Sequence, residues 1–241
     1  MNLCDPRTIR DVMSMYGMTF RKELGQNFLT NAAVVEDIAD ACSDTRDATI
    51  LEIGPGIGVL TQELGMRYRR VLSVEIDRRL VPLLRFTLQD CPPGIVEIIN
   101  QDFMKADLHE LLDDAFAAGS VSVCANLPYY ITTPILMRLL ESGLPFSCIT
   151  VMVQAEVADR LCARAGSKDY GAITAVLNYY GAAEKLFRVP ALTLQLDYLA
   201  TDTLGKLVRQ FYASPQGGLR RSAHPPVAGK ARPSRRREAV L

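Results

Sequence analysis

The sequence lacks the features of a membrane-bound or exported protein. None of its apolar runs approaches the roughly 18–20 residues of a transmembrane helix. The N-terminus places Asp5, Arg7, Arg10 and Asp11 among its apolar residues, so it has no apolar core of a signal peptide. We therefore expect a cytoplasmic protein with no membrane partner.

Histidine is scarce and the cysteines are scattered, which argues against a metal centre. The six cysteines form no C-x-x-C pair, and His109 and His224 are the two histidines. Zinc sites draw on closely spaced cysteines and histidines, and disulfides are rare in proteins that are not exported. We expect free thiols, most of them buried, and no bound metal.

Short apolar runs alternate with helical patterns through most of the chain. The runs predict the strands Thr49–Ile53, Val71–Ile76, Ile95–Ile99, Val121–Ala125 and Ile149–Val153, and the patterns predict the helices Val59–Arg67, Arg78–Leu88, Met104–Leu112, Pro134–Glu141 and Ala155–Ala163. Two earlier helices are predicted, one from Pro6 to Gly17 with Asp5 as its cap, and one from Asn31. The alternation predicts an α/β fold with a doubly wound, mostly parallel, Rossmann-like sheet.

The pattern is less regular toward the C-terminus. Ala172–Tyr180 reads as a sixth strand, with a helix as the alternative. Leu192–Leu199 alternates like a half-buried strand, and Thr203–Tyr212 is compatible with a brief helix. From Ser214 onward the chain is rich in Pro, Gly, Ser and Arg, a composition typical of disorder.

Charge is unevenly distributed along the chain. The sequence has 27 basic and 27 acidic residues, but from Leu219 onward seven basic residues accompany one acid, so this tail carries +6 and the remainder −6. A mildly acidic body argues against RNA binding that rests mainly on phosphate contacts. We divide the chain into a catalytic domain (1–190), an atypical segment (191–213) and a basic tail (214–241).

The first predicted strand runs into a glycine-rich turn, Glu52-Ile-Gly-Pro-Gly-Ile-Gly58, and a helix follows. Such glycines let the backbone turn tightly and approach a ligand at a helix N-terminus. A single turn of this kind is weak evidence, but Gly54, Gly56 and Gly58 give the spacing G-x-G-x-G and not G-x-G-x-x-G. The tighter loop suits a ligand without a diphosphate, such as S-adenosylmethionine.

Acidic residues follow the second and third predicted strands. Glu75 lies 21 residues after Gly54, a distance at which an acid can accept both ribose hydroxyls of an adenosine. Asp102 follows the third strand, where it can accept from an adenine amino group or simply cap the next helix before Met104. Together with the glycine turn, these acids indicate an adenosine-containing ligand.

The fourth strand ends in Asn126-Leu-Pro-Tyr129, the most specific signal in the chain. The amino group of adenine is a poor nucleophile because its lone pair is delocalised into the ring. Acceptors such as the Asn126 amide oxygen and the Leu127 carbonyl can draw that nitrogen toward a pyramidal geometry. Pro128 stiffens the turn and removes a competing donor, and Tyr129 offers a face on which a flipped base can stack.

Together these motifs resemble the KsgA-type ribosomal RNA adenine dimethyltransferases over roughly the first 190 residues. The matching segments are Leu24-Gly-Gln-Asn-Phe-Leu29, Glu52-Ile-Gly-Pro-Gly56, Val74-Glu-Ile-Asp77, Asn126-Leu-Pro-Tyr129, Ile131-Thr-Thr-Pro134 and Ser167-Lys-Asp-Tyr-Gly171. The resemblance implies a methyltransferase fold and, as residues at the cofactor or the reaction centre, Asn27, Leu29, Gly54, Glu75, Asp102 and Asn126. It also implies N6,N6-dimethylation of two adjacent adenosines near the 3′ end of small-subunit rRNA, with S-adenosylmethionine and without a metal.

Three alternatives remain beside this interpretation. A related group of macrolide-resistance methylases shares the core and acts on large-subunit rRNA. A non-catalytic RNA-binding or ribosome-assembly protein can keep the same fold. A nicotinamide-dependent dehydrogenase is disfavoured by the glycine spacing.

The resemblance ends after Phe187-Arg-Val-Pro190. Family members continue with a second aromatic residue, a Pro-rich stretch, a last strand and a small helical domain, whereas this chain continues with Ala191-Leu-Thr-Leu-Gln195 and the basic tail. The departure implies near-normal cofactor binding, salt-sensitive RNA binding, and slow or absent dimethylation. Leu192–Leu199 is expected to serve as a substitute strand that closes the sheet.

Overall fold

The structure is a computed structural model that describes residues 1–18, 29–127, 130–189 and 205–212. Two helices, α1 (Pro6–Met15) and α2 (Ala32–Asp40), precede the sheet. The side chain of Asp5 accepts from the backbone of Arg7 and Thr8 to cap α1, and Asn31 caps α2 in the same manner. Both predicted starts are therefore confirmed by the caps that their sequences supply.

The sheet has seven strands in the order β3-β2-β1-β4-β5-β7-β6. The strands are β1 (Thr49–Ile53), β2 (Arg70–Glu75), β3 (Val96–Asn100), β4 (Val121–Asn126), β5 (Cys148–Gln154), β6 (Gly181–Val189) and β7 (Gly205–Tyr212). The first five are parallel, while β7 runs antiparallel to both β5 and β6. The expected doubly wound, mostly parallel sheet is confirmed.

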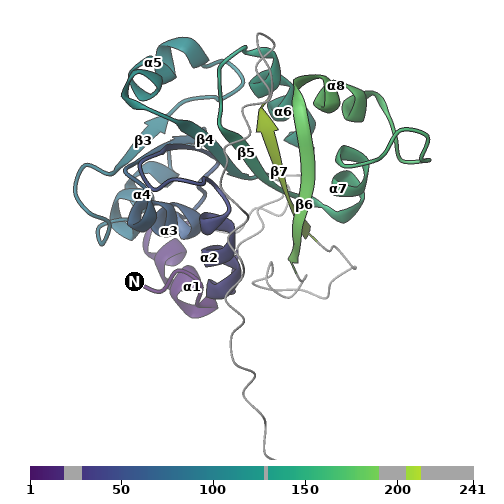
Figure 1. The fold of residues 1–241 in the computed structure, drawn as a ribbon. Coiled ribbons are helices and arrows are strands. Elements are labelled where there is room, and N and C mark those ends of the chain that lie inside the picture. Colours follow the sequence, from purple (N-terminus) through teal and green to yellow (C-terminus); the bar gives the residue numbers. More distant parts are fainter. Residues whose placement is uncertain (19–28, 128–129, 190–204, 213–241) are drawn as a thin grey trace, which may run out of the picture.

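Helices cover both faces of this sheet (Figure 1). Those that follow α2 are α3 (Val59–Arg67), α4 (Leu80–Thr87), α5 (Leu108–Ala118), α6 (Thr132–Glu141), α7 (Ala155–Leu161) and α8 (Ala172–Tyr180). Buried side chains of α1 to α4 form one core with one face of the sheet, and those of α5 to α8 form a second core with the other. The chain order changes direction between β1 and β4, which is where open α/β sheets bind ligands.

The central strands are apolar on both faces. In β1, Ile50 belongs to the core with α1 to α4, whereas Leu51 and Ile53 belong to the core with α5 to α8. All five residues of β1 are buried. Parallel strands covered on both sides read as continuous apolar runs, and for this reason the sequence located them to within one or two residues.

Two predicted elements near the C-terminal end are wrong. Ala172–Tyr180, expected as a strand, is helix α8, in which Leu177 packs into the core. Part of Thr203–Tyr212, expected as a helix, is strand β7, which pairs along its whole length with β5 and β6. Leu192–Leu199, expected as a substitute strand, and the basic tail lie outside the described residues.

The cysteines agree with the expectation of free thiols. None of the six is in a disulfide, and four of them are buried. In the described part of the chain, no helix is long and apolar enough to cross a membrane.

Candidate functional site

A cavity of about 250 Å³ opens at the carboxyl ends of β1 to β4. Small-molecule sites span roughly 300–1,000 Å³, so this one lies just below that range. Seven residues predicted from the sequence line it: Leu29, Gly54, Gly56, Glu75, Asp102, Asn126 and Leu127. The structure thus brings together residues that are up to about a hundred positions apart in the sequence.

The glycine turn forms the floor of one end of the cavity. Gly54 and Gly56 have φ angles of 73° and 61°, in the left-handed region that a side chain would strain. The Gly54 N–H donates to the carbonyl of Val74 at 3.0 Å, which ties the turn to β2. Space next to both glycines is open, since a Cβ on either would meet no atom within 4 Å. The backbone is therefore accessible to a ligand.

Glu75 ends β2 and faces this turn. Its Oε2 accepts from the Gly56 N–H at 3.3 Å and its Oε1 from the Asp77 N–H at 2.8 Å. Burial raises the pKa of this carboxyl, and the backbone donors oppose that shift. Each carboxylate oxygen has two lone pairs, so the two backbone bonds orient Glu75 and leave acceptor capacity for ligand hydroxyls.

Asn100, the last residue of β3, and Gln101 after it hold the end of β2 in place, a role that was not predicted from the sequence. The Asn100 side chain donates to the Glu75 carbonyl at 2.8 Å, and the Gln101 N–H donates to the same carbonyl at 3.0 Å. Both of these bonds depend on the parallel pairing of Glu75 with Asn100. An Asn at the end of a strand gives no such signal in the sequence, because its partner is set by the neighbouring strand.

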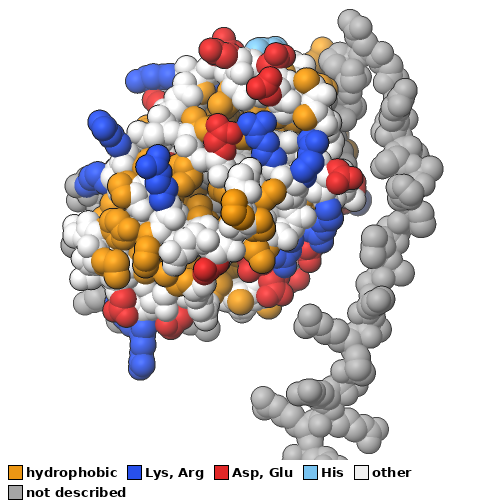
Figure 2. Space-filling view, turned by 90° about the vertical axis from the view of Figure 1, so that its left-hand side faces the viewer, with side chains coloured by type: hydrophobic (Ala, Val, Ile, Leu, Met, Phe, Trp, Pro, Cys, Tyr) orange, Lys and Arg blue, Asp and Glu red, His pale blue; other side chains and the backbone are white. Residues whose placement is uncertain are grey.

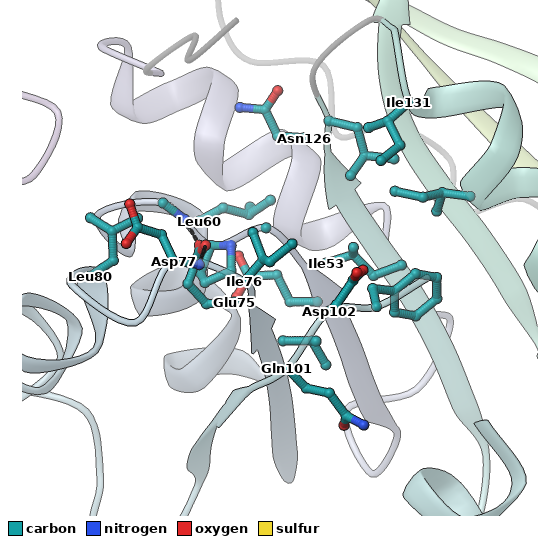
Figure 3. A pocket seen from close by; sticks show the side chains of 18 of the residues that line it. Ile53, Leu60, Glu75, Ile76, Asp77, Leu80, Gln101, Asp102, Asn126 and Ile131 are labelled. Atoms are coloured by element: carbon teal, nitrogen blue, oxygen red, sulfur yellow. Dashed lines mark hydrogen bonds between the residues drawn. The ribbon is translucent and has the colours of Figure 1, made fainter. Parts of the chain in front are cut away.

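Asp102 has the capping role considered for it and also lies at the cavity. Its Oδ1 accepts from the Met104 N–H at 3.0 Å, which is the turn-capping role. It also lines the cavity, and Figure 3 shows it with Gln101 on the side of the pocket that β3 supplies. Lys105 lies 3.5 Å from its Oδ2, and the Asp102 side chain is partly exposed. One carboxylate can cap the turn and still accept from a ligand.

Asn126 and Leu127 form the opposite end of the cavity. Asn126 is the last residue of β4 and pairs with Met152 of β5, while Leu127 is buried in the core under the site. Figure 3 shows Asn126 and Ile131 across the pocket from Glu75 and Asp77. Asn27, Pro128 and Tyr129, which the sequence also assigns to the site, lie outside the described residues.

Glu52 is a buried acid beneath the glycine turn that was not singled out from the sequence. Its side chain is 2% exposed, lines the cavity and accepts from the Ser73 hydroxyl at 2.8 Å. Burial raises its pKa to about 7, with the hydrogen bond from Ser73 acting in the opposite direction and the charge of Glu75 in the same direction. Its position two residues before Gly54 was visible in the sequence, but its burial was not.

Comparison with known proteins shows the family of the chain. The sequence model of the ribosomal RNA adenine dimethylase family matches residues 17–226. The chain belongs to this family. It is 44% identical over 188 residues to the ribosomal RNA small subunit methyltransferase A of Alkaliphilus oremlandii, a match that covers 78% of the chain. The chain spans 65% of the length of that relative.

Two solved structures share the fold. A dimethyladenosine transferase from Plasmodium falciparum superposes with a TM-score of 0.66 at 22% identity, covering 77% of this chain and 63% of that one. The 23S rRNA methyltransferase ErmE superposes with a TM-score of 0.65 at 26% identity, covering 78% and 70%. The Rossmann-like methyltransferase fold expected from the sequence is confirmed.

Proposed function

We propose that this protein transfers methyl groups from S-adenosylmethionine to the N6 amines of two adjacent adenosines near the 3′ end of small-subunit rRNA. One observation carries the proposal: a single cavity joins the glycine turn and Glu75 at one end to Asn126 and Leu127 at the other. Family membership supports the reaction, and the name of the Alkaliphilus relative supports the choice of RNA. The proposed partner is the small ribosomal subunit during its assembly in the cytoplasm.

The residues of the cavity fit the cofactor. Glu75 would accept from the ribose hydroxyls and Asp102 from the adenine amino group, while Gly54 and Gly56 admit close approach of the ligand to the backbone. The exposed side chain of Ile76 lines the same end and offers an apolar surface to the adenine ring. S-adenosylmethionine supplies an electrophilic methyl group on a positively charged sulfur. Leu29 and Asn27 are proposed to complete this end of the site.

The target adenine would enter from the β4 side of the cavity. There the Asn126 amide oxygen and the Leu127 carbonyl would accept the two N6 hydrogens and orient the nitrogen lone pair toward the methyl group. Pro128 and Tyr129 are proposed to stiffen the turn and to stack on the base. Catalysis then rests on position and hydrogen bonding, because a fixed near-attack geometry removes much of the entropic barrier.

Large-subunit rRNA is the second candidate substrate, favoured by the structural likeness to ErmE at 26% identity. The decisive experiment offers the purified protein and labelled S-adenosylmethionine to small and large ribosomal subunits that lack the modification. We expect label in two adjacent adenosines of the small subunit. Label in the large subunit would favour the second candidate, and cofactor binding without transfer to either would favour a non-catalytic assembly role.

A further inference from the structure

One aromatic side chain at the cavity has no role in the account so far. Tyr130 lines the cavity, yet it is 68% exposed. Among the described residues, the other exposed tyrosines are Tyr170 and Tyr179, and neither lines the cavity. An exposed ring at the mouth of a pocket loses water contact only when a ligand covers it, so its location suggests a contact with an incoming molecule.

The backbone under Tyr130 is anchored while its ring is free of the core. Thr132, at the start of α6, is 1% exposed, and Ile131 is partly buried against the core formed with α5 to α8. These neighbours anchor the chain on the α6 side of Tyr130. The exposed ring of Tyr130 therefore lies next to a packed segment, which limits the conformational freedom lost on binding.

The position of Tyr130 assigns it to the side of the proposed RNA substrate. It follows Asn126 and Leu127 by a few residues, on the loop that leaves β4. The other strongly exposed apolar side chain of the cavity, Ile76, follows β2 beside the glycine turn, where the cofactor is proposed to bind. An adenosine that reaches Asn126 from solvent has its neighbours in the RNA at the rim, which is where Tyr130 lies.

Basic and acidic side chains are mixed on one face of the molecule. On the face shown in Figure 2, Lys and Arg side chains are interspersed with Asp and Glu and with apolar side chains. Phosphate contacts are weakened by adjacent acids, and they position RNA without holding individual bases. Single-stranded RNA is held instead by stacking of its bases on aromatic rings, with little preference among bases.

We propose that Tyr130 stacks on the nucleotide next to the target adenosine, in a single-stranded segment of RNA. This rests on the proposed function and adds an aromatic contact at the rim of the cavity, separate from the stack proposed for Tyr129. The contact holds the flanking nucleotide at the rim and so keeps the target base in reach of Asn126. Tyr130 is a substrate-binding residue and does not act on the methyl group.

The test compares Tyr130→Ala, Tyr130→Leu and Tyr130→Phe with the wild-type protein on small-subunit particles. For Tyr130→Ala we expect KM for the particles to rise about tenfold, since one stacked base contributes roughly a factor of 5 to 150. We expect kcat and the affinity for S-adenosylmethionine to change less than twofold. Tyr130→Phe keeps the ring and should match the wild type, whereas Tyr130→Leu keeps an apolar side chain without a ring and should resemble Tyr130→Ala.

Tyr179→Ala is the matched control, because Tyr179 is 76% exposed on α8 and does not line the cavity. It should leave KM unchanged. An unchanged KM in Tyr130→Ala, with an active wild type, would overturn the inference and mark Tyr130 as an ordinary solvated tyrosine. Equal KM values for Tyr130→Leu and the wild type would overturn stacking in favour of a general apolar contact.

A second readout separates this inference from the proposed function. Short single-stranded RNAs carry 2-aminopurine at the position before or after the target adenosine, and stacking quenches its fluorescence. We expect quenching with the wild type and Tyr130→Phe, at one of the two positions, and at least fivefold weaker RNA binding with Tyr130→Ala. If the wild type transfers no methyl group, the proposed function fails, while quenching that depends on Tyr130 still supports the contact. Equal quenching with Tyr130→Ala overturns it.

Discussion

The middle of the sheet and its β6 edge differ in how their strands are buried. The strands β1 and β4, which carry the candidate site, are buried along almost their whole length. At the edge, β6 is a mixture of partly buried and exposed residues, and Val189 is its one buried residue. The interior strands therefore fix the position of functional side chains, whereas the hairpin of β6 and β7 completes the sheet on one side of β5.

This difference determines which strands can hold functional side chains in fixed positions. Glu75 and Asn126 each end a parallel strand that is held by neighbours on both sides, so their positions are fixed by pairing on both flanks. Charged residues of β6, such as Glu184 and Lys185, are exposed on an edge strand. Substitutions at the ends of the interior strands should therefore change cofactor binding or methyl transfer, whereas exposed substitutions in β6 should leave both unchanged. Four experiments examine this contrast.

The largest effect is expected for Asn126→Ala at the end of β4. It removes an acceptor proposed to act on the adenine amine during transfer, so kcat should fall about 100-fold or more. The affinity for S-adenosylmethionine should stay within about twofold, measured by calorimetry, while single-turnover assays measure transfer. A single-turnover rate equal to that of the wild type would show that Asn126 has no part in the reaction.

Glu75→Ala should weaken binding of S-adenosylmethionine by roughly 1.5–3 kcal/mol, the scale of hydrogen bonds to a charged group. Its control is Glu184→Ala, which removes an exposed carboxylate of β6. Calorimetry should find that the control binds the cofactor as the wild type does. Equal affinities for both variants would remove Glu75 from the cofactor site.

Glu52→Gln should change how stability depends on pH. The pKa of Glu52 is about 7 in the folded protein, against about 4.3 in an unfolded chain. Between these values the unfolded chain has released its proton and the folded protein has not, so the free energy of unfolding falls as pH rises from about 4.5 to 7. Above pH 7 the free energy of unfolding is lower than at low pH by the full amount, roughly 2–4 kcal/mol.

Glutamine has no proton to release, so Glu52→Gln should gain stability relative to the wild type as pH rises through that window. Denaturant unfolding at pH 5, 6, 7 and 8 measures the difference. Glu97→Gln is the control, because Glu97 is exposed on β3 in an ion pair with Arg70. Parallel stability profiles for Glu52→Gln and the wild type would contradict the raised pKa.

The smallest effect is expected for Lys185→Ala in β6. Lys185 forms an ion pair of 2.6 Å with Asp159, and both side chains are well exposed. Surface pairs of this kind contribute about 0–1 kcal/mol and are screened by salt. Unfolding should shift by less than about 1 kcal/mol, and methyl transfer should not change. A loss of transfer comparable to that of Asn126→Ala would mean that the hairpin contributes to the site.

The sequence predicted residues that line the cavity better than it predicted the C-terminal part of the fold. Gly54, Glu75 and Asn126 stand at the ends of runs whose burial on both faces makes them readable as strands, and strand ends are where such sheets bind ligands. Ala172–Tyr180 is a nine-residue apolar run, a length at which periodicity does not separate a strand from a buried helix. Packing against α6 and α7 decides in favour of the helix.

The sequence alone thus determined the five parallel strands, the glycine turn and the acids that follow the strands, because local burial and spacing encode them. Only the tertiary structure decided that Gly205–Tyr212 is a strand, since its pairing partners β5 and β6 lie elsewhere in the chain. It also decided that Glu52 is buried to the point of a raised pKa and that the ring of Tyr130 stays exposed at the rim. Strand pairing and the exposure of a single side chain depend on residues distant in sequence, and no local pattern carries that information.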